Sequence, residues 1–236
     1  MKKKLLLIFS GLFLLAACAG NGDEETMNRE NEENRMEQTD SVSSSPMEIV
    51  GTNEYGRGAE SDGQDTNRDE EPMKILTEQA DSIIIYFSRS GNTENLVKMI
   101  HNETNADILE LTLVNPYPED YEETVERANE ERETNNFPEI STDIPNLSPY
   151  NHIYLGYQTW AMTLSNPIIR FLDDYGDLLD GKIIHPFSSN AGYGEGNSLT
   201  RMQDLLPNST IEESFAVEDA EVVSSENELV EWIKNQ

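Results

Sequence analysis

The chain has 236 residues and a formal net charge of −30, from 46 acidic and 16 basic residues. This length suits one domain of ordinary size with appendages. The acidity argues against a nucleic-acid partner, because a phosphate backbone needs a basic surface. The one cysteine, Cys18, excludes an intramolecular disulfide, and the three histidines have no metal-ligand spacing, so we expect no metal site.

Residues 1–17 are predicted to form an export signal. Lysines at positions 2–4 precede an apolar run, Leu5 to Leu15, that is too short to span a bilayer comfortably. The sequence Leu15-Ala16-Ala17-Cys18 resembles the lipobox of bacterial lipoproteins. The resemblance implies that Cys18 is lipidated, becomes the new N-terminus and anchors the protein at the outer face of the cytoplasmic membrane. An ordinary signal peptide with an incidental cysteine is the alternative.

Residues 18–76 are predicted to be the lipidated cysteine followed by a disordered acidic tether. The segment is rich in Glu, Asp, Asn, Ser and Gly, and its few apolar residues show no sustained period. Such a segment buries too little surface to offset the entropy lost on ordering. It could hold the folded domain, residues 77–236, away from the membrane.

The domain alternates strands and helices, which is typical of a parallel α/β sheet. A breaker cluster, Asn115-Pro116-Tyr117-Pro118, precedes the second helix, whose apolar face is expected to be Tyr121, Val125 and Ala128. The last helix is expected to bury Trp232. We expect strands at about 82–88, 106–111, 152–156, 182–187 and 209–217, and helices at about 93–102, 118–134, 166–180, 199–206 and 225–235.

A short polar loop, Ser88-Arg89-Ser90-Gly91-Asn92-Thr93, joins the first strand to the first helix. Gly91 lets the backbone approach an anion closely, and the hydroxyl groups, the amide and the free N–H groups of the helix can donate to it. The pattern S-x-S-G-N-T resembles the FMN-phosphate loop of the flavodoxin family at every defined position. An ordinary strand-to-helix turn, capped by Ser90 or Asn92, is the alternative.

The resemblance covers about residues 80–236. It implies an α/β, flavodoxin-like three-layer sandwich, with a five-stranded parallel sheet of order 2-1-3-4-5 and helices on both faces. Loops 88–93, 156–162 and 188–196 would then open on one crevice beyond the carboxyl ends of the strands, a rule for which flavodoxin itself is an established example. The residues that the resemblance assigns to binding of the cofactor FMN are Ser88, Arg89, Ser90, Gly91, Asn92, Thr93, Tyr157, Gln158, Thr159, Trp160, Ala161, Ser189, Asn190, Gly192, Tyr193 and Gly194.

A flat flavin ring favours aromatic stacking, for which Trp160 and Tyr193 are the candidates, with Tyr157 a weaker one. Trp160 could instead be a core residue, and the glycines beside Tyr193 could simply form a turn. Related sequences often have Pro and an aliphatic residue where this chain has Gln158 and Thr159. The resemblance therefore leaves the conformation of the second loop open.

The expected function is FMN-dependent electron transfer by a lipid-anchored carrier. The flavin carries the redox chemistry, so we predict no catalytic residue, and the sequence names neither a redox partner protein nor a small acceptor. Two alternatives stay open. One is an NAD(P)H-dependent flavin or quinone reductase of the same fold, and the other is a surface binding lipoprotein that no longer holds flavin.

Overall fold

The computed structural model describes residues 45–50, 71–77 and 79–236. All of them fall within one compact unit, residues 44–236. The predicted export signal, the predicted lipidation site at Cys18 and most of the predicted tether lie outside the described residues.

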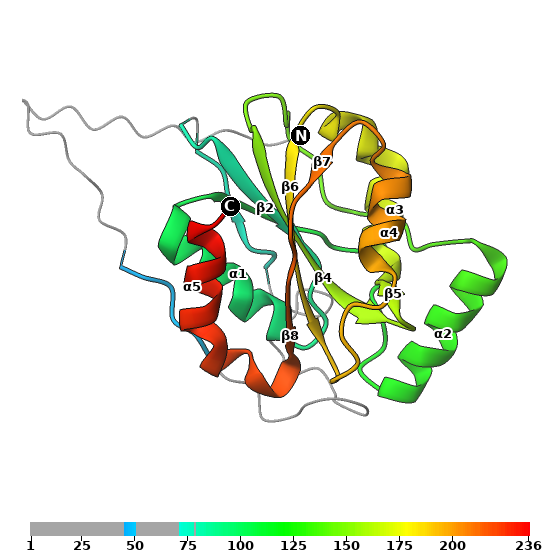
Figure 1. Ribbon diagram of the computed structural model, residues 1–236. Helices are drawn as coiled ribbons and strands as arrows, with labels where there is room; N and C mark the ends of the chain where they lie inside the picture. Colours follow the sequence, from blue (N-terminus) through cyan, green and yellow to red (C-terminus); the bar gives the residue numbers. More distant parts are fainter. Residues whose placement is uncertain (1–44, 51–70, 78) are drawn as a thin grey trace, which may run out of the picture. The chain divides into compact units, whose positions relative to one another are not determined.

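A twisted, mostly parallel sheet forms the centre of the domain (Figure 1). Its strands β3 (Asp107–Glu110), β2 (Ser82–Tyr86), β4 (His152–Trp160), β6 (Ile183–Asn190) and β7 (Thr210–Ile211) lie side by side in that order, all with parallel pairing. If these five parallel strands are numbered 1 to 5 by their order in the chain, their order in the sheet is 2-1-3-4-5, as predicted. The central strand β2 is apolar and β-branched, and its residues 83–86 are fully buried, as a strand covered on both faces requires.

The sheet differs from five parallel strands in three places. A short edge strand, β1 (Lys74–Ile75), pairs antiparallel with β3, and β5 (Thr163–Leu164) forms a hairpin with the end of β4. The predicted fifth strand is divided into β7 and β8 (Phe215–Glu218), both of which pair with β6. The division lies opposite Pro186, and proline has no amide hydrogen to donate to a neighbouring strand.

Helices cover both faces of the sheet (Figure 1). One layer consists of α1 (Asn92–Thr104) and α5 (Glu226–Lys234), and the other of α2 (Tyr121–Thr134), α3 (Asn166–Tyr175) and α4 (Ser198–Leu205). Short 3₁₀ helices at Gly176–Leu179, Asp219–Glu221 and Val223–Ser225 complete the helical structure of the described residues. The strands alternate between two apolar clusters, since Ile83 and Ile85 belong to the cluster under α2–α4, whereas Ile84 packs with α1 and α5.

Two strands run further than the sequence predicts. Strand β4 continues past Gly156 to Trp160, and β6 continues to Asn190, because their polar ends still pair with each other, with β5 and with β8. Trp232, expected in the core, is half-buried: its ring packs against the α1–α5 cluster while Nε1 donates to the Glu213 carbonyl at 2.8 Å.

The prediction of a disordered tether is wrong for its described parts. Residues 74–75 form β1, and the backbone N–H of Met73 donates to the Glu110 carboxylate at 2.9 Å. Residues 45–50 lie against α1, where Asn95 and Asn102 bind their backbone. Composition alone misses these contacts because they are made by polar side chains of the folded domain.

Candidate functional site

A cleft of about 790 Å³ lies where the chain leaves β2, β4 and β6. Its walls include Arg89, Ser90 and Asn92 from the first predicted loop, residues 158–162 from the second, and residues 189–191, 193 and 194 from the third. The predicted convergence of the three loops is therefore a feature of the fold.

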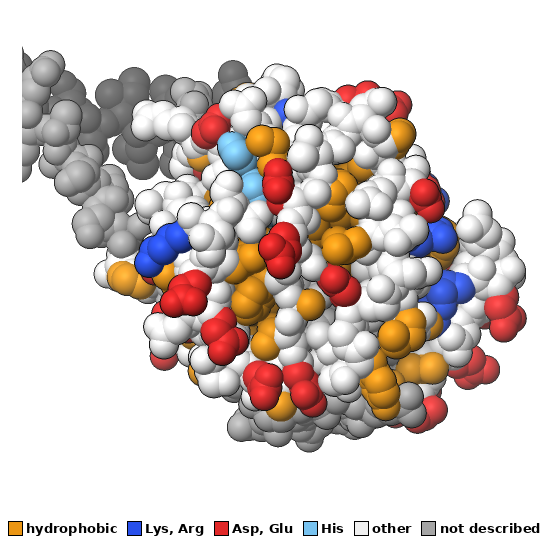
Figure 2. Space-filling view, in the orientation of Figure 1, with side chains coloured by type: hydrophobic (Ala, Val, Ile, Leu, Met, Phe, Trp, Pro, Cys, Tyr) orange, Lys and Arg blue, Asp and Glu red, His pale blue; other side chains and the backbone are white. Residues whose placement is uncertain are grey.

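In Figure 2, acidic side chains are spread over the face that carries α5 and β8, whereas basic side chains gather between α4 and α2.

The first loop turns at Gly91, which adopts φ +81° immediately before α1. This left-handed conformation strains any residue with a Cβ, which explains the glycine. The Gly91 N–H donates to Ser88 Oγ at 3.1 Å, so the loop is tightly closed. Thr93 is almost completely buried, and its Oγ1 lies 2.9 Å from Ser189 Oγ in the third loop.

The second loop is the end of β4 and a two-residue turn into β5. Gln158 crosses to the first loop, where its Nε2 donates to the Phe87 carbonyl and, at 2.7 Å, to Thr93 Oγ1. The turn residues Ala161 and Met162 have φ values of +49° and +62°, a conformation that costs free energy for residues with a Cβ. Buried Thr159 Oγ1 has no hydrogen-bond partner among the described residues.

The third loop supports this turn through close backbone contact. A Cβ on Gly196 would lie 2.1 Å from the Met162 carbonyl oxygen, so only glycine fits there. The next residue, Asn197, donates its backbone N–H to the same oxygen at 2.9 Å. Asn190 organises the start of the loop by accepting the N–H groups of Gly192 and Gly194 at 3.0 and 2.9 Å. Tyr193, between them, is 58% exposed at the rim of the cleft.

The predicted site residues divide into two groups. Those that line the cleft are Arg89, Ser90, Asn92, Gln158, Thr159, Trp160, Ala161, Ser189, Asn190, Tyr193 and Gly194. The others, Ser88, Gly91, Thr93, Tyr157 and Gly192, shape the loops or lie beneath them and do not line the cleft.

The prediction that the strand ends at Gly156 placed Tyr157 wrongly in the binding loop, because β4 continues to Trp160. Tyr157 continues the alternation of Ile153 and Leu155 on the core face of β4 and is fully buried. Its hydroxyl donates to Glu195 at 3.2 Å, and burial raises its pKa well above the usual value, with the Glu195 charge adding to the effect. Tyr157 therefore cannot stack on a ligand in the cleft.

Helix α2 supplies a wall of the cleft that the sequence did not predict. The predicted apolar face is only partly buried, since Ala128 is buried while Tyr121 and Val125 are half-buried and line the cleft. The stripe itself was the available signal, but an apolar helix face looks the same whether it packs on a core or on a ligand. Other wall residues absent from the prediction are Glu122, Thr124, Asn129, Arg132, Met162, Ala191 and Asp219.

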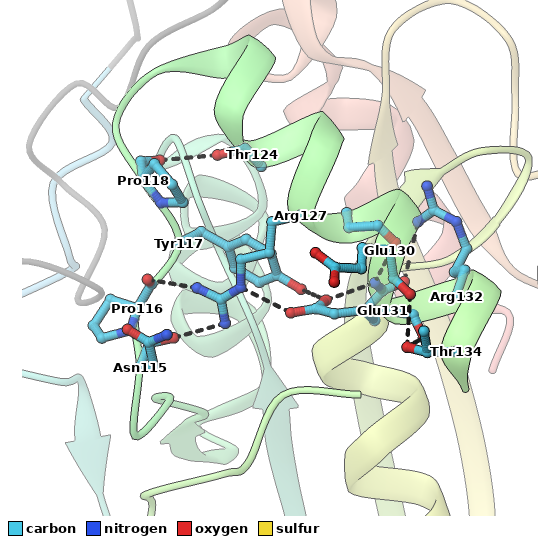
Figure 3. Close-up of polar contacts among 12 residues, drawn as sticks. Asn115, Pro116, Tyr117, Pro118, Thr124, Arg127, Glu130, Glu131, Arg132 and Thr134 are labelled. Atoms are coloured by element: carbon cyan, nitrogen blue, oxygen red, sulfur yellow. Dashed lines mark hydrogen bonds and ion pairs between the residues drawn. The ribbon is translucent and has the colours of Figure 1, made fainter. Parts of the chain in front are cut away.

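A buried polar network fixes α2 to the loop before it (Figure 3). Glu131 accepts hydrogen bonds from the Tyr117 hydroxyl, from Arg127 Nε at 2.8 Å and from Asn166 Nδ2 at 2.8 Å. The Arg127 guanidinium lies 4.1 Å from the centre of the Tyr117 ring and also donates to the carbonyls of residues 115 and 116. Burial, followed by the bond to Glu131, raises the Tyr117 pKa well above the usual value.

This network also sets the position of Trp160. The Trp160 ring meets Tyr117 and Phe87 edge to face, with centroids 5.1 and 6.1 Å apart. Trp160 is half-buried, packs against the core and also lines the cleft, so its place in the core does not remove it from the cleft wall.

Arg132 brings a positive charge to the α2 wall. Its guanidinium donates to Asn166 Oδ1 at 3.1 Å and to Asn129 Oδ1 at 2.6 Å, and no carboxylate of the described residues forms an ion pair with it. Burial lowers the Arg132 pKa. In so acidic a chain, an arginine held by neutral amides at a cleft favours an anionic ligand.

The described residues offer neither a metal cluster nor a membrane-spanning helix. They contain no group of three or more His, Cys, Asp or Glu side chains placed to hold a metal ion. None of their helices combines the length and the apolar character needed to cross a membrane.

The sequence matches a family model described as Flavodoxin over residues 81–236. No curated protein matches the chain.

Solved structures provide a second comparison. A candidate flavoprotein of Bacteroides uniformis is 20% identical, with a TM-score of 0.57 over 66% of this chain and 99% of that one. A flavoprotein of Lactobacillus acidophilus, solved in complex with FMN, is 21% identical, with a TM-score of 0.51 over 62% and 98%. A candidate flavoprotein of Bacteroides eggerthii is 20% identical, with a TM-score of 0.53 over 64% and 98%. At these identities the likeness establishes a shared fold.

Proposed function

Because this chain belongs to the flavodoxin family, we propose that its cleft binds FMN and that the domain transfers electrons. The observation that carries the proposal is the convergence of three strand-end loops on one cleft of about 790 Å³. That volume lies in the ordinary range for small-molecule sites. When bound, FMN supplies one- and two-electron redox chemistry.

The first loop fits the phosphate group. Gly91 brings the backbone close, Ser90 and Asn92 offer polar side chains on the cleft wall, and α1 begins there, so its dipole favours an anion. Arg89 lines the same part of the cleft and is held by its donation to the Glu119 carbonyl at 2.6 Å. The loop is therefore closed by its own hydrogen bonds, and the Arg89 side chain places a positive charge beside it.

Aromatic and apolar groups fit the ring. Trp160 is held by its edge contacts, whereas Tyr193 is exposed on the third loop. A rigid aromatic on one wall and a more accessible one on the other suit a flat ligand that must enter and then be covered. The side chain of Val125, on α2, adds apolar surface nearby.

The proposal is tested by adding FMN to the purified domain and following the loss of FMN fluorescence. We expect saturable quenching, and at least about tenfold weaker binding for Trp160→Leu, which is about 1.4 kcal/mol. The chain's other tryptophan gives the matched control, because Trp232 lies on α5 and Trp232→Leu should leave the affinity unchanged. A folded domain that never quenches FMN contradicts the proposal.

A carrier and a reductase are separated by one further assay. We expect the FMN-loaded domain to exchange electrons with artificial donors while showing no steady oxidation of NADH or NADPH in the presence of a quinone. Steady oxidation assigns the domain to the reductases of the same fold instead.

We also propose that Cys18 is lipidated and anchors the protein at the outer face of the cytoplasmic membrane. The support is the sequence Leu15-Ala16-Ala17-Cys18 after a short apolar run. Cells that express the full chain with labelled palmitate should label the wild type and not Cys18→Ala. Equal labelling of both proteins contradicts the anchor.

A further inference from the structure

Two asparagines on α1 bind the backbone of a segment that lies far earlier in the chain. Asn95 Oδ1 accepts the Val50 N–H at 3.1 Å, and its Nδ2 donates to the Val50 carbonyl at 2.7 Å. Asn102 repeats the pattern with Met47, at 2.8 and 3.1 Å. Each side-chain amide therefore satisfies both the donor and the acceptor of one residue.

The spacing of the two asparagines matches an extended peptide. Asn95 and Asn102 are seven residues apart, which is about two helical turns and about 10 Å along the axis. Met47 and Val50 are three residues apart, which also spans about 10 Å in an extended chain. The two side-chain amides bind the backbone of the segment by hydrogen bonds, as the exposed edge of a β-sheet binds an extended peptide.

The segment also presents an apolar side to the domain. Met47 and Ile49 are half-buried against the cluster under α1 and α5, whereas Glu48 and Val50 are exposed. This alternation is the period of an extended strand with one face covered. Ordering a backbone costs entropy, so these four hydrogen bonds and the apolar contacts must outweigh that cost for the segment to stay bound.

We propose that this face of α1 is a peptide-binding site whose occupant is residues 46–50 of the same chain. The docked segment ends beside the phosphate loop, because Val50 is held by Asn95, whose own N–H donates to the Gly91 carbonyl at 2.9 Å. The site thus attaches the N-terminal part of the chain at the ligand-binding end of α1. None of this depends on FMN or on lipidation.

Hydrogen exchange of the full chain, without added FMN, tests the site. In the wild type the amides of Met47 and Val50, which donate to Asn102 and Asn95, should exchange at least about tenfold more slowly than in the double variant Asn95→Ala/Asn102→Ala. Asn227→Ala is the matched control, because Asn227 is an exposed asparagine on another helix, α5, and should change nothing. Slow exchange in β4 and β6 reports whether each variant is folded.

A second variant leaves the domain untouched. Ile49→Asp places a charge on the half-buried side of the segment and should release it as fully as the double variant does. Fast exchange of the Met47 and Val50 amides in the wild type overturns the proposal, as does slow exchange of these amides that persists in both variants. Slow exchange that disappears on dilution also overturns it, because the occupant is then a second copy.

Discussion

Thr93 Oγ1 lies 2.9 Å from Ser189 Oγ and thereby joins the segment after β2 to the end of β6. The same Thr93 oxygen accepts a hydrogen bond from Gln158 Nε2 at 2.7 Å, so one buried hydroxyl connects all three loops of the cleft. A threonine expected to bind phosphate thus has a second task inside the protein. It holds the three loops in register.

Replacing Thr93 with valine should destabilise the protein and weaken FMN binding together. The change leaves Ser189 Oγ without its bond to Thr93 and removes one of the two hydrogen bonds of Gln158 Nε2, and losing a buried partner typically costs about 1–3 kcal/mol. Urea unfolding measures the stability, and fluorescence titration measures the affinity. In a double-mutant cycle of Thr93→Val and Ser189→Ala, the losses of unfolding free energy should be less than additive because the two residues are in contact.

The control for this prediction is Thr200→Val, since Thr200 is an exposed threonine on α4. It should leave both measurements unchanged. Strict additivity of Thr93→Val and Ser189→Ala contradicts the link between the loops.

Gly91 and Gly181 allow backbone strain to be separated from ligand binding. Their φ values are +81° and +76°, and a Cβ on Gly181 would meet nothing within 4 Å. Gly91→Ala and Gly181→Ala should each lose about 1–2 kcal/mol of unfolding free energy, from the left-handed conformation. Only Gly91→Ala should weaken FMN binding, by at least about tenfold. Equal affinities in the two variants argue against a phosphate site at this loop.

The sequence predicted most of the sheet because its strands are apolar runs of β-branched residues, as Ile83–Ile85 illustrates. It ended β4 too early because Gln158 and Thr159 resemble a loop, and their strand conformation depends on pairing with β5 and β6. One consequence was the placement of Tyr157 in the site. A strand continued through Tyr157 would have put its side chain on the core face, beside Leu155.

The missing wall of the site has a different physical cause. Periodicity predicts that Tyr121 and Val125 share a face of α2, and this is confirmed, but it cannot say what the face covers. Likewise, nothing in the composition of residues 45–50 indicates that Asn95 and Asn102 bind them. Contacts between distant polar groups depend on the fold and leave no local pattern.

Tyr117→Phe should destabilise the protein by about 1.5–3 kcal/mol, the usual range for a hydrogen bond to a charged group. Glu131 is buried and keeps its bonds from Arg127 and Asn166 but loses the Tyr117 hydroxyl (Figure 3). Chemical unfolding followed by circular dichroism measures the loss. Tyr175→Phe is the matched control, because the Tyr175 hydroxyl makes no hydrogen bond among the described residues and its removal should be neutral. A neutral Tyr117→Phe means that the network contributes nothing to α2.

His185 should make the protein less stable as the pH falls from about 7.5 to 5.5. Its ring is buried between Tyr154 and His152, its Nδ1 donates to Gln236 Oε1 at 2.8 Å, and its Nε2 lies 2.9 Å from His152 Nδ1. Burial lowers its pKa below the unfolded value of about 6.5. The unfolded chain therefore binds this proton first as the pH falls, and the free energy of unfolding decreases by up to about 1.4 kcal/mol per pH unit over that range.

Urea unfolding at several pH values between 7.5 and 5.5 measures this dependence. A His185→Gln variant should give a flatter curve, because glutamine has no proton to gain. Each protein is compared with itself across the pH range, so a lower overall stability of the variant does not affect the result. The sign is diagnostic, because a histidine whose pKa was raised by a carboxylate would instead gain stability as the pH falls. Equal slopes for the two proteins contradict a neutral, buried His185.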